Sequence, residues 1–209
     1  MSVRGPYAKS RERKAAITAA SLQLVIERGH ENVSTAEVAR SAGITESSLL
    51  YHFPTRDELL VATLTAADPI LMANEVDVGA IADPVEVLRS VVSQGMGEPN
   101  RLRLFTEMLA RASDPTHPAH QYITEHHRLS LAYAAKLLRI RQDNGLAHPD
   151  VDPDRFGREI VAIWDGLQAQ WLVNRDFDLA DAVGNAFRRL CREDVMETKR
   201  TMEQLAAGL

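Results

Sequence analysis

Helix-start signals recur along this 209-residue sequence, and they constrain its fold more than any other feature. Two capping boxes, residues 34–37 (STAE) and 55–58 (TRDE), pair a hydroxyl with a carboxylate that together satisfy the free backbone N–H groups of a first helical turn. Residues 83–84 and 152–153 place an N-cap aspartate before a proline at the first helical position. No run of β-branched residues alternates with polar ones, so the sequence predicts an all-α fold.

Capping residues and apolar periodicity together predict about nine helices. Their expected ranges are 10–28, 35–42, 46–52, 56–67, 84–94, 100–113, 119–143, 153–174 and 179–206. Residues 68–83 and 144–152 contain Asp, Pro and Gly and are expected to be loops. We expect two domains, an N-terminal one over residues 1–56 and a larger C-terminal one over residues 57–209.

Composition and charge narrow the class of protein. Hydrophobic residues make up 45% and charged residues 25% of the chain, as in globular proteins rather than disordered ones. The single cysteine, Cys191, excludes a disulfide within the chain and fits a reducing compartment. No apolar run approaches the ~18 residues of a membrane span. The stretch 15–26 has the pattern of an amphipathic helix rather than a signal peptide, so we expect a cytoplasmic protein without a membrane partner.

The charge is unevenly distributed. The formal net charge of the chain is −5, yet residues 1–14 contain only one acid, Glu12. The basic residues of this arm are Arg4, Lys9, Arg11, Arg13 and Lys14. A basic arm on an acidic body predicts a local contact with an anionic partner, although a solvated run of charge is the alternative.

Residues 34–53 have the pattern of a helix-turn-helix. Ala39 is small where a second helix crosses, and Gly43 permits the left-handed backbone of a tight turn. Thr45 is placed to cap a short second helix, whose Leu49 returns to the core. Such a helix has the size that enters a major groove, but the same spacing also fits a plain three-helix bundle with a glycine turn.

The residues around this segment, over 11–62, resemble the TetR family of bacterial transcription regulators. The matching positions are Ala19-Ala20, Gly29, Val38-Ala39, Gly43-Ile44, Tyr51-His52-Phe53 and Arg56-Asp57-Glu58-Leu59-Leu60. The resemblance implies a homodimeric regulator of transcription, most simply a repressor released from a palindromic operator in double-stranded DNA by a small-molecule effector. It implies neither an enzyme nor a cofactor.

The resemblance also implies which residues contact DNA: Ser34, Thr35, Thr45, Ser47, Ser48, Tyr51, His52 and Arg56. Ser34 or Thr35 would offer a helix N-terminus to a phosphate, and Arg56 would clamp a phosphate at the start of the next helix. Two positions depart from the family pattern. Leu50 stands where many relatives carry an aromatic residue, and Glu46 places an acid near the phosphates, where it could instead accept a cytosine amino proton.

The C-terminal part resembles the family in its helical character and length, which implies effector binding and dimerisation there. Stripes of apolar and aromatic residues at helical spacing provide the candidates, with the alternative that they form only a solid core. The effector candidates are Phe105, Met108, Tyr122, His126, Trp164 and Gln168, and apolar lining favours a largely hydrophobic ligand. The dimer candidates are Trp171, Leu172, Val183, Phe187 and Leu190.

Parts of this sequence also fit other interpretations. A DNA-binding regulator without an effector fits the same residues, and an all-helical enzyme or carrier would use the N-terminal helices only as a scaffold. Residues 150–154 begin like a calcium loop, but Arg155 stands where that loop needs glycine, so no metal site is expected.

Overall fold

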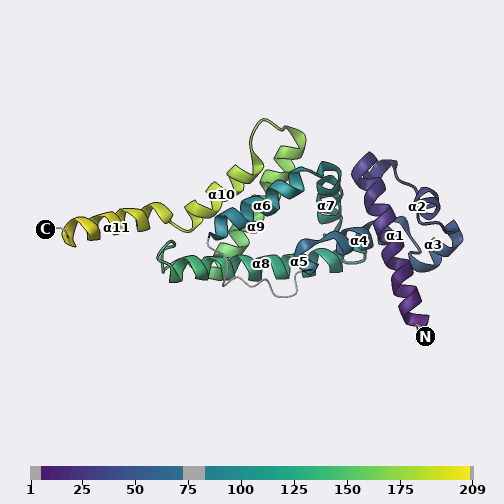
Figure 1. Ribbon diagram of the computed structural model, residues 1–209, viewed down its shortest axis with the longest axis horizontal. Helices are drawn as coiled ribbons and strands as arrows, with labels where there is room; N and C mark the ends of the chain where they lie inside the picture. The colour runs from purple at the N-terminus through teal and green to yellow at the C-terminus, as the bar shows by residue number, and fades with distance from the viewer. Residues whose placement is uncertain (1–5, 73–82, 208–209) are drawn as a thin grey trace, which may run out of the picture. The chain divides into compact units, whose positions relative to one another are not determined.

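The computed structural model describes residues 6–72 and 83–207, and within these residues the chain is all-α, as the sequence predicts (Figure 1). This described part contains eleven α-helices and one 3-10 turn, η1, and no strand. The elements are α1 (Pro6–Arg28), η1 (His30–Asn32), α2 (Thr35–Ser41), α3 (Glu46–His52), α4 (Arg56–Ala67), α5 (Pro69–Met72), α6 (Pro84–Met96), α7 (Pro99–Arg111), α8 (Ala119–Asp143), α9 (Pro153–Val173), α10 (Leu179–Leu190) and α11 (Glu193–Ala207).

Helices that begin at a clear cap agree best with the expected bounds. The helices expected at 35–42, 46–52, 56–67 and 153–174 appear as α2, α3, α4 and α9 with ends no more than one residue away. Ser34 and Thr55 both form complete capping boxes, which explains why α2 and α4 start where the sequence predicts.

Two other expectations need correction near the N-terminal half. The first helix begins at Pro6 rather than residue 10, so Lys9 is helical together with Arg11, Arg13 and Lys14. The loop expected at 68–83 contains the short helix α5 (Pro69–Met72), and its residues 73–82 lie outside the described residues. The loop expected at 144–152 is confirmed.

The prediction of a single helix over residues 179–206 is wrong, because α10 ends at Leu190 and a separate helix, α11, begins at Glu193. Arg192 adopts a φ of 53°, a left-handed conformation that is uncommon for a residue other than glycine. The break is held by neighbours from other segments: the backbone N–H of His148 donates to the carbonyl of Cys191 over 2.9 Å, and Cys191 is fully buried. No glycine or proline marks this site, so the sequence pattern runs through it.

The contacts of the chain divide it into two compact units, whereas the expected division at residue 56 is one of function and stays a prediction. Unit 1 contains α1 to α5, α7 and residues 119–125 of α8, whereas unit 2 contains α6, the rest of α8 and α9 to α11. The boundary expected at residue 56 falls inside unit 1, because both α4 and α7 pack against α1. Helical periodicity describes which face of a helix is apolar but does not identify the helix that covers it, which explains the difference.

The core of unit 1 joins the first helix to the helix-turn-helix and to α7. Ile17 and Val25 of α1 are fully buried in one apolar cluster with Leu49 of α3, Leu60 of α4 and Leu104 of α7. Because α2 and α3 have only seven residues each, they depend on this burial, as isolated helices of that length do not persist in water.

Unit 2 has its own core and one buried arginine. The rings of Phe156 in α9 and Phe187 in α10 meet edge to face with centroids 4.9 Å apart. Arg141 near the end of α8 is 1% exposed, and its guanidinium lies 3.1 Å from Asp83 and 2.9 Å from Glu193. A charge that is buried needs such partners, and here they join the ends of three helices, α6, α8 and α11.

Nowhere in residues 6–72 and 83–207 does a helix combine the length and the apolar character that crossing a membrane requires.

Helices α8 and α9 approach each other closely at Gly157, and this contact can be tested by substitution. A β-carbon at Gly157 would lie 3.0 Å from the backbone oxygen of Leu131, whereas one at Gly166, also in α9, would meet nothing within 4 Å. Alanine has about 1 kcal/mol better helix propensity than glycine at either position, but overpacking at 157 costs about 1–3 kcal/mol. We expect Gly166→Ala to raise, and Gly157→Ala to lower, the free energy of unfolding measured in urea. Equal stability of the two variants would contradict the close approach.

Candidate nucleic-acid interface

The helix-turn-helix forms as the residue pattern predicts. Gly43 has a φ of 67° in the turn after α2, and the next residue, Ile44, donates its N–H to the carbonyl of Ala39 over 3.0 Å. Ala39 is 1% exposed, which fits the small residue expected where α3 crosses. Thr45 is the N-cap of α3, and its hydroxyl accepts from the N–H of Ser48 over 3.2 Å.

One face of α3 is open to solvent. Tyr51 is 84% exposed, a value that only Val173 exceeds among the exposed large hydrophobic side chains of the described residues. Thr45 and Ser47 are also exposed, with their hydroxyl oxygens 3.1 Å apart, and Ser48 is half-buried. His52 is half-buried and packs edge to face with the ring of Tyr51 at 5.3 Å. These side chains form a row of hydroxyl and aromatic groups along a helix that has the size to enter a groove.

Two carboxylates lie at the N-terminal end of α2. The Ser34 hydroxyl donates to Glu37 over 2.8 Å, and hydrogen bonds from the side chain and backbone of Ser34 hold the pKa of the Glu37 carboxyl below its usual range. The Thr35 hydroxyl donates to Glu46 of α3 over 2.6 Å. Both hydroxyls expected to face a phosphate therefore engage carboxylates of this chain, and Glu46 also ties the start of α3 to the start of α2.

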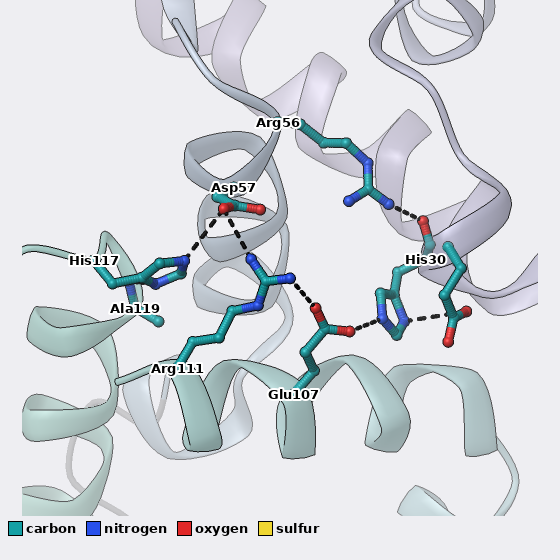
Figure 2. Close-up of polar contacts among 8 residues, drawn as sticks. His30, Arg56, Asp57, Glu107, Arg111, His117 and Ala119 are labelled. Atoms are coloured by element: carbon teal, nitrogen blue, oxygen red, sulfur yellow. Dashed lines mark hydrogen bonds and ion pairs between the residues drawn. The ribbon is translucent and has the colours of Figure 1, made fainter. Parts of the chain in front are cut away.

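Arg56 lies where the sequence predicts, at the first position of α4. Its guanidinium, however, binds backbone carbonyls of this chain. Its Nε donates to the carbonyl of Val33 over 3.2 Å, and its Nη2 donates to the carbonyl of His30 (Figure 2). Arg56 thus holds the segment that precedes α2. Its contact with DNA stays a prediction.

Basic side chains of α1 lie close to the end of the helix-turn-helix. Lys9, Arg11, Arg13 and Lys14 are all exposed, whereas Arg4 lies outside the described residues. The ammonium of Lys14 lies 5.6 Å from the centroid of the Phe53 ring, which follows α3 directly. Phe53 itself is 6% exposed, so its ring packs in the core.

The effector candidates divide between the two units, and each set has its own surroundings. In unit 1, Met108 is 1% exposed and belongs to the apolar core, while the rings of Phe105 and Tyr122 meet edge to face at 6.5 Å. The Tyr122 hydroxyl donates to buried Asp68 over 2.9 Å, and burial together with this carboxylate raises the pKa of Tyr122 well above its usual value.

In unit 2, Gln168 of α9 is buried and Trp164 is half-buried. His126 is half-buried beside His127, whose Nε2 lies 3.4 Å from Asp165 of α9. These contacts bring polar groups of α8 and α9 together. An effector role for the candidates of either unit stays a prediction.

The dimer candidates are mostly interior residues of unit 2. Val183 and Phe187 are no more than 1% exposed and Trp171 is 5% exposed, so the three side chains are already covered within one protomer. Leu172 and Leu190 are half-buried. The apolar periodicity of α9 and α10 identified the faces that pack inside this unit, and it could not distinguish them from a surface that packs on a second copy.

The sequence analysis missed a group of polar residues next to the helix-turn-helix. Figure 2 shows His30, Glu107, Arg111, Asp57 and His117 joined in one chain of hydrogen bonds and ion pairs. No local signal could have found it, because His30 and Glu107 are 77 residues apart in the sequence.

Relatives of known class match this chain. Residues 17–63 match the family model described as bacterial regulatory proteins, tetR family. The HTH-type transcriptional regulator PksA of Bacillus subtilis is 23% identical over 90% of this chain and 95% of its own length. The HTH-type transcriptional regulator RutR of Escherichia coli is 31% identical, over 48% of this chain and 50% of RutR.

Solved structures share the fold. A TetR-family protein from Rhodococcus sp. superposes with a TM-score of 0.66 at 20% identity, covering 87% of this chain and 99% of that one. A transcriptional regulator from Saccharomonospora viridis in complex with choline gives 0.63 at 21% identity, over 86% and 95%. Thermus thermophilus FadR, a repressor in complex with lauroyl-CoA, gives 0.59 at 20% identity, over 85% and 92%. Residues 17–63, which contain the helix-turn-helix, therefore match the tetR family of bacterial regulatory proteins, and the chain shares the fold of TetR-family transcriptional regulators over most of its length.

Proposed function

We propose that this protein is a homodimeric repressor that reads a palindromic operator with α3 and releases it when a small effector binds. The single observation that supports this most is the exposure of Tyr51, 84%, near the end of a helix that also has Thr45 and Ser47 exposed at its start. Hydroxyl and aromatic groups in a row match base edges, thymine methyls and phosphates.

Phosphate contacts would come from both ends of the reading helix. The exposed basic residues of α1 and the half-buried His52 supply positive or hydrogen-bonding groups. The N-terminus of α2, with Ser34 and Thr35, offers backbone N–H groups to a phosphate. Glu46 would have to exchange its bond with Thr35 for a base, and the natural partner is a cytosine amino group. Glu46 therefore works against duplexes that lack this base.

A dimer is needed because one short helix reads few base pairs, and two copies related by a two-fold axis read a palindrome. Its proposed surface lies mainly on α11, because that helix exposes Val195, Met202 and Leu205 by 45%, 65% and 67%. Val173 at the end of α9 is 90% exposed, and Leu172 beside it is half-buried. Exposed apolar side chains in a row are typical of a surface that a second copy covers.

Effector control would act through α4. This helix starts at Arg56, which holds the segment before α2, and it ends at Asp68, which accepts a hydrogen bond from Tyr122 of α8. A ligand that reorders Tyr122 would therefore alter the contact at the far end of α4. A shift from 1:99 to 99:1 between DNA-binding and released states requires about 5.5 kcal/mol of differential binding. Lauroyl-CoA, which a protein of this fold binds, carries a long acyl chain and so supports a ligand with a substantial apolar part.

In this proposal, residues 1–56 contact DNA, and residues 57–209 bind the effector and form the dimer. Helix α4 links the two functions. A regulator without an effector remains the second candidate, and the interior packing of Met108 and Gln168 favours it.

Selection from a randomised pool of DNA duplexes tests the function. We expect the protein to enrich a palindromic sequence, and its affinity in fluorescence anisotropy to fall as salt rises, because phosphate contacts release counterions. If the selection enriches no sequence, the repressor proposal is contradicted. Adding lauroyl-CoA or choline to the complex with the selected duplex then tests the effector class. Release by either compound supports a ligand-responsive regulator, and indifference to both favours the second candidate.

Two substitutions separate DNA contact from support of the fold. Tyr51→Ala should weaken operator binding about tenfold and leave the melting temperature unchanged, because the side chain is exposed. Arg56→Ala should weaken binding and also lower the free energy of unfolding by about 1–3 kcal/mol, because the carbonyls of His30 and Val33 lose their donor. Thr65→Ala, exposed on α4, is the control. Operator affinity that is unchanged in Tyr51→Ala would exclude the proposed contact.

The dimer surface is tested by charge on α11. Met202→Glu combined with Leu205→Glu should convert a dimer into a monomer in sedimentation velocity, because two carboxylates buried together cost several kcal/mol. Val91→Glu, which changes a 38%-exposed apolar residue of α6, is the matched control and should leave the dimer intact. A dimer that survives the α11 variant and dissociates in the control would move the interface to α6.

A further inference from the structure

A chain of polar contacts connects α7 to both ends of the helix-turn-helix. Glu107 and Arg111 project from one face of α7, four residues apart, and their side chains meet at 2.7 Å. Glu107 accepts a hydrogen bond from Nε2 of His30 in η1, and Arg111 lies 3.1 Å from Asp57 in the first turn of α4 (Figure 2). Because η1 precedes α2 and α4 follows α3, these two contacts bracket the residues that read DNA.

The first contact is buried. The His30 side chain is 3% exposed, and a carboxylate can only accept, so Nε2 of His30 must carry its hydrogen. Burial of Glu107 works in the opposite direction, but the hydrogen bond and charge of His30 and the charge of Arg111 hold the pKa of Glu107 below its usual value. Glu31 lies 3.7 Å from the other ring nitrogen of His30, and Arg56 binds the His30 carbonyl. Both the side chain and the backbone of His30 are therefore held.

The second contact, between Arg111 and Asp57, is reinforced by His117. Nδ1 of His117 accepts the backbone N–H of Ala119 over 3.1 Å, so Nε2 of the neutral ring carries the hydrogen and donates to Asp57 over 3.2 Å. Asp57 thus receives Arg111 from α7 and His117 from the segment after it. At the end of α1, Asn100 of α7 donates to the carbonyl of Ile26 over 2.9 Å, which adds a third contact from α7 to the same region.

We propose that Glu107, with Arg111, is a positioning residue for DNA binding that lies outside the 17–63 segment matched to the family: α7 holds η1 and the start of α4 at the spacing in which α3 can enter the groove. Without these contacts the ends of the helix-turn-helix gain freedom that binding must remove, and preorganisation is lost. The proposal rests on the DNA-binding function and adds residues of α7 to it.

The sign of the effect makes the test sharp. Removing a negative charge from a DNA-binding protein should tighten binding if only long-range electrostatics act. The positioning role requires the opposite result. We expect Glu107→Ala to weaken binding to the selected operator about tenfold, and Glu107→Gln to restore part of it, because the amide oxygen can still accept from His30.

The matched control is Glu159→Ala. Glu159 also pairs with an arginine four residues away, Arg155 at 2.7 Å, but it lies on α9 in unit 2. Glu159→Ala removes the same charge as Glu107→Ala and the same kind of ion pair. Its operator affinity should stay within about twofold of the wild type. Asp57→Asn provides a second, nearly isosteric variant at the other end of the chain of contacts and should weaken binding in the same direction.

Each variant is measured in the whole 209-residue chain. Its melting temperature is recorded first, and its affinity is then determined at a lower temperature and at two salt concentrations. The salt dependence should equal that of the wild type, because neither Glu107 nor Asp57 contacts a phosphate. Glu107→Ala that binds as tightly as the wild type, or more tightly, would overturn the positioning role. A wild-type protein that binds no selected duplex would instead overturn the repressor proposal itself, so the two failures are distinguishable.

Discussion

The burial of α2 and α3 against α1 and α4 is the constraint on which the DNA-reading part of this protein depends. Seven residues make about two helical turns, too few to persist alone in water. Val38 and Leu49 have no exposed surface, and they share an apolar cluster with Val25 of α1 and Leu60 of α4. The outward residues of α3 can therefore be chosen for DNA, because the inward ones already hold the helix.

Polar contacts add direction to this apolar packing. A hydrophobic cluster is tolerant of small rotations of one helix on another, whereas hydrogen bonds to charged groups are directional and stronger than neutral ones. Around the helix-turn-helix such bonds occur at its two ends, where Arg56 holds the carbonyls before α2 and Asp57 receives Arg111. The reading helix is thus positioned by groups that do not themselves need to touch DNA.

Unit 2 uses the same principle at the break between α10 and α11. Arg141 is buried, and its pairs with Asp83 and Glu193 join the start of α6 to the start of α11. A left-handed Arg192 between the two helices turns the chain at a residue type that rarely adopts this conformation. The cost of that turn is offset by burial of Cys191 and by the ion pairs of Glu193, and it leaves the apolar side chains of α11 exposed.

The sequence alone determined the all-α class, the starts of the capped helices and the helix-turn-helix, because caps, glycine turns and apolar spacing act within a few residues. The resemblance of residues 11–62 to the TetR family is likewise visible in the sequence alone, and a family model matches residues 17–63. Only the tertiary structure decided that Arg56 binds backbone carbonyls, that Val183 and Phe187 are interior, and that Glu107 reaches His30. Periodicity tells which face of a helix is apolar, but the partner of that face, and any pairing across 77 residues, depends on how the whole chain packs.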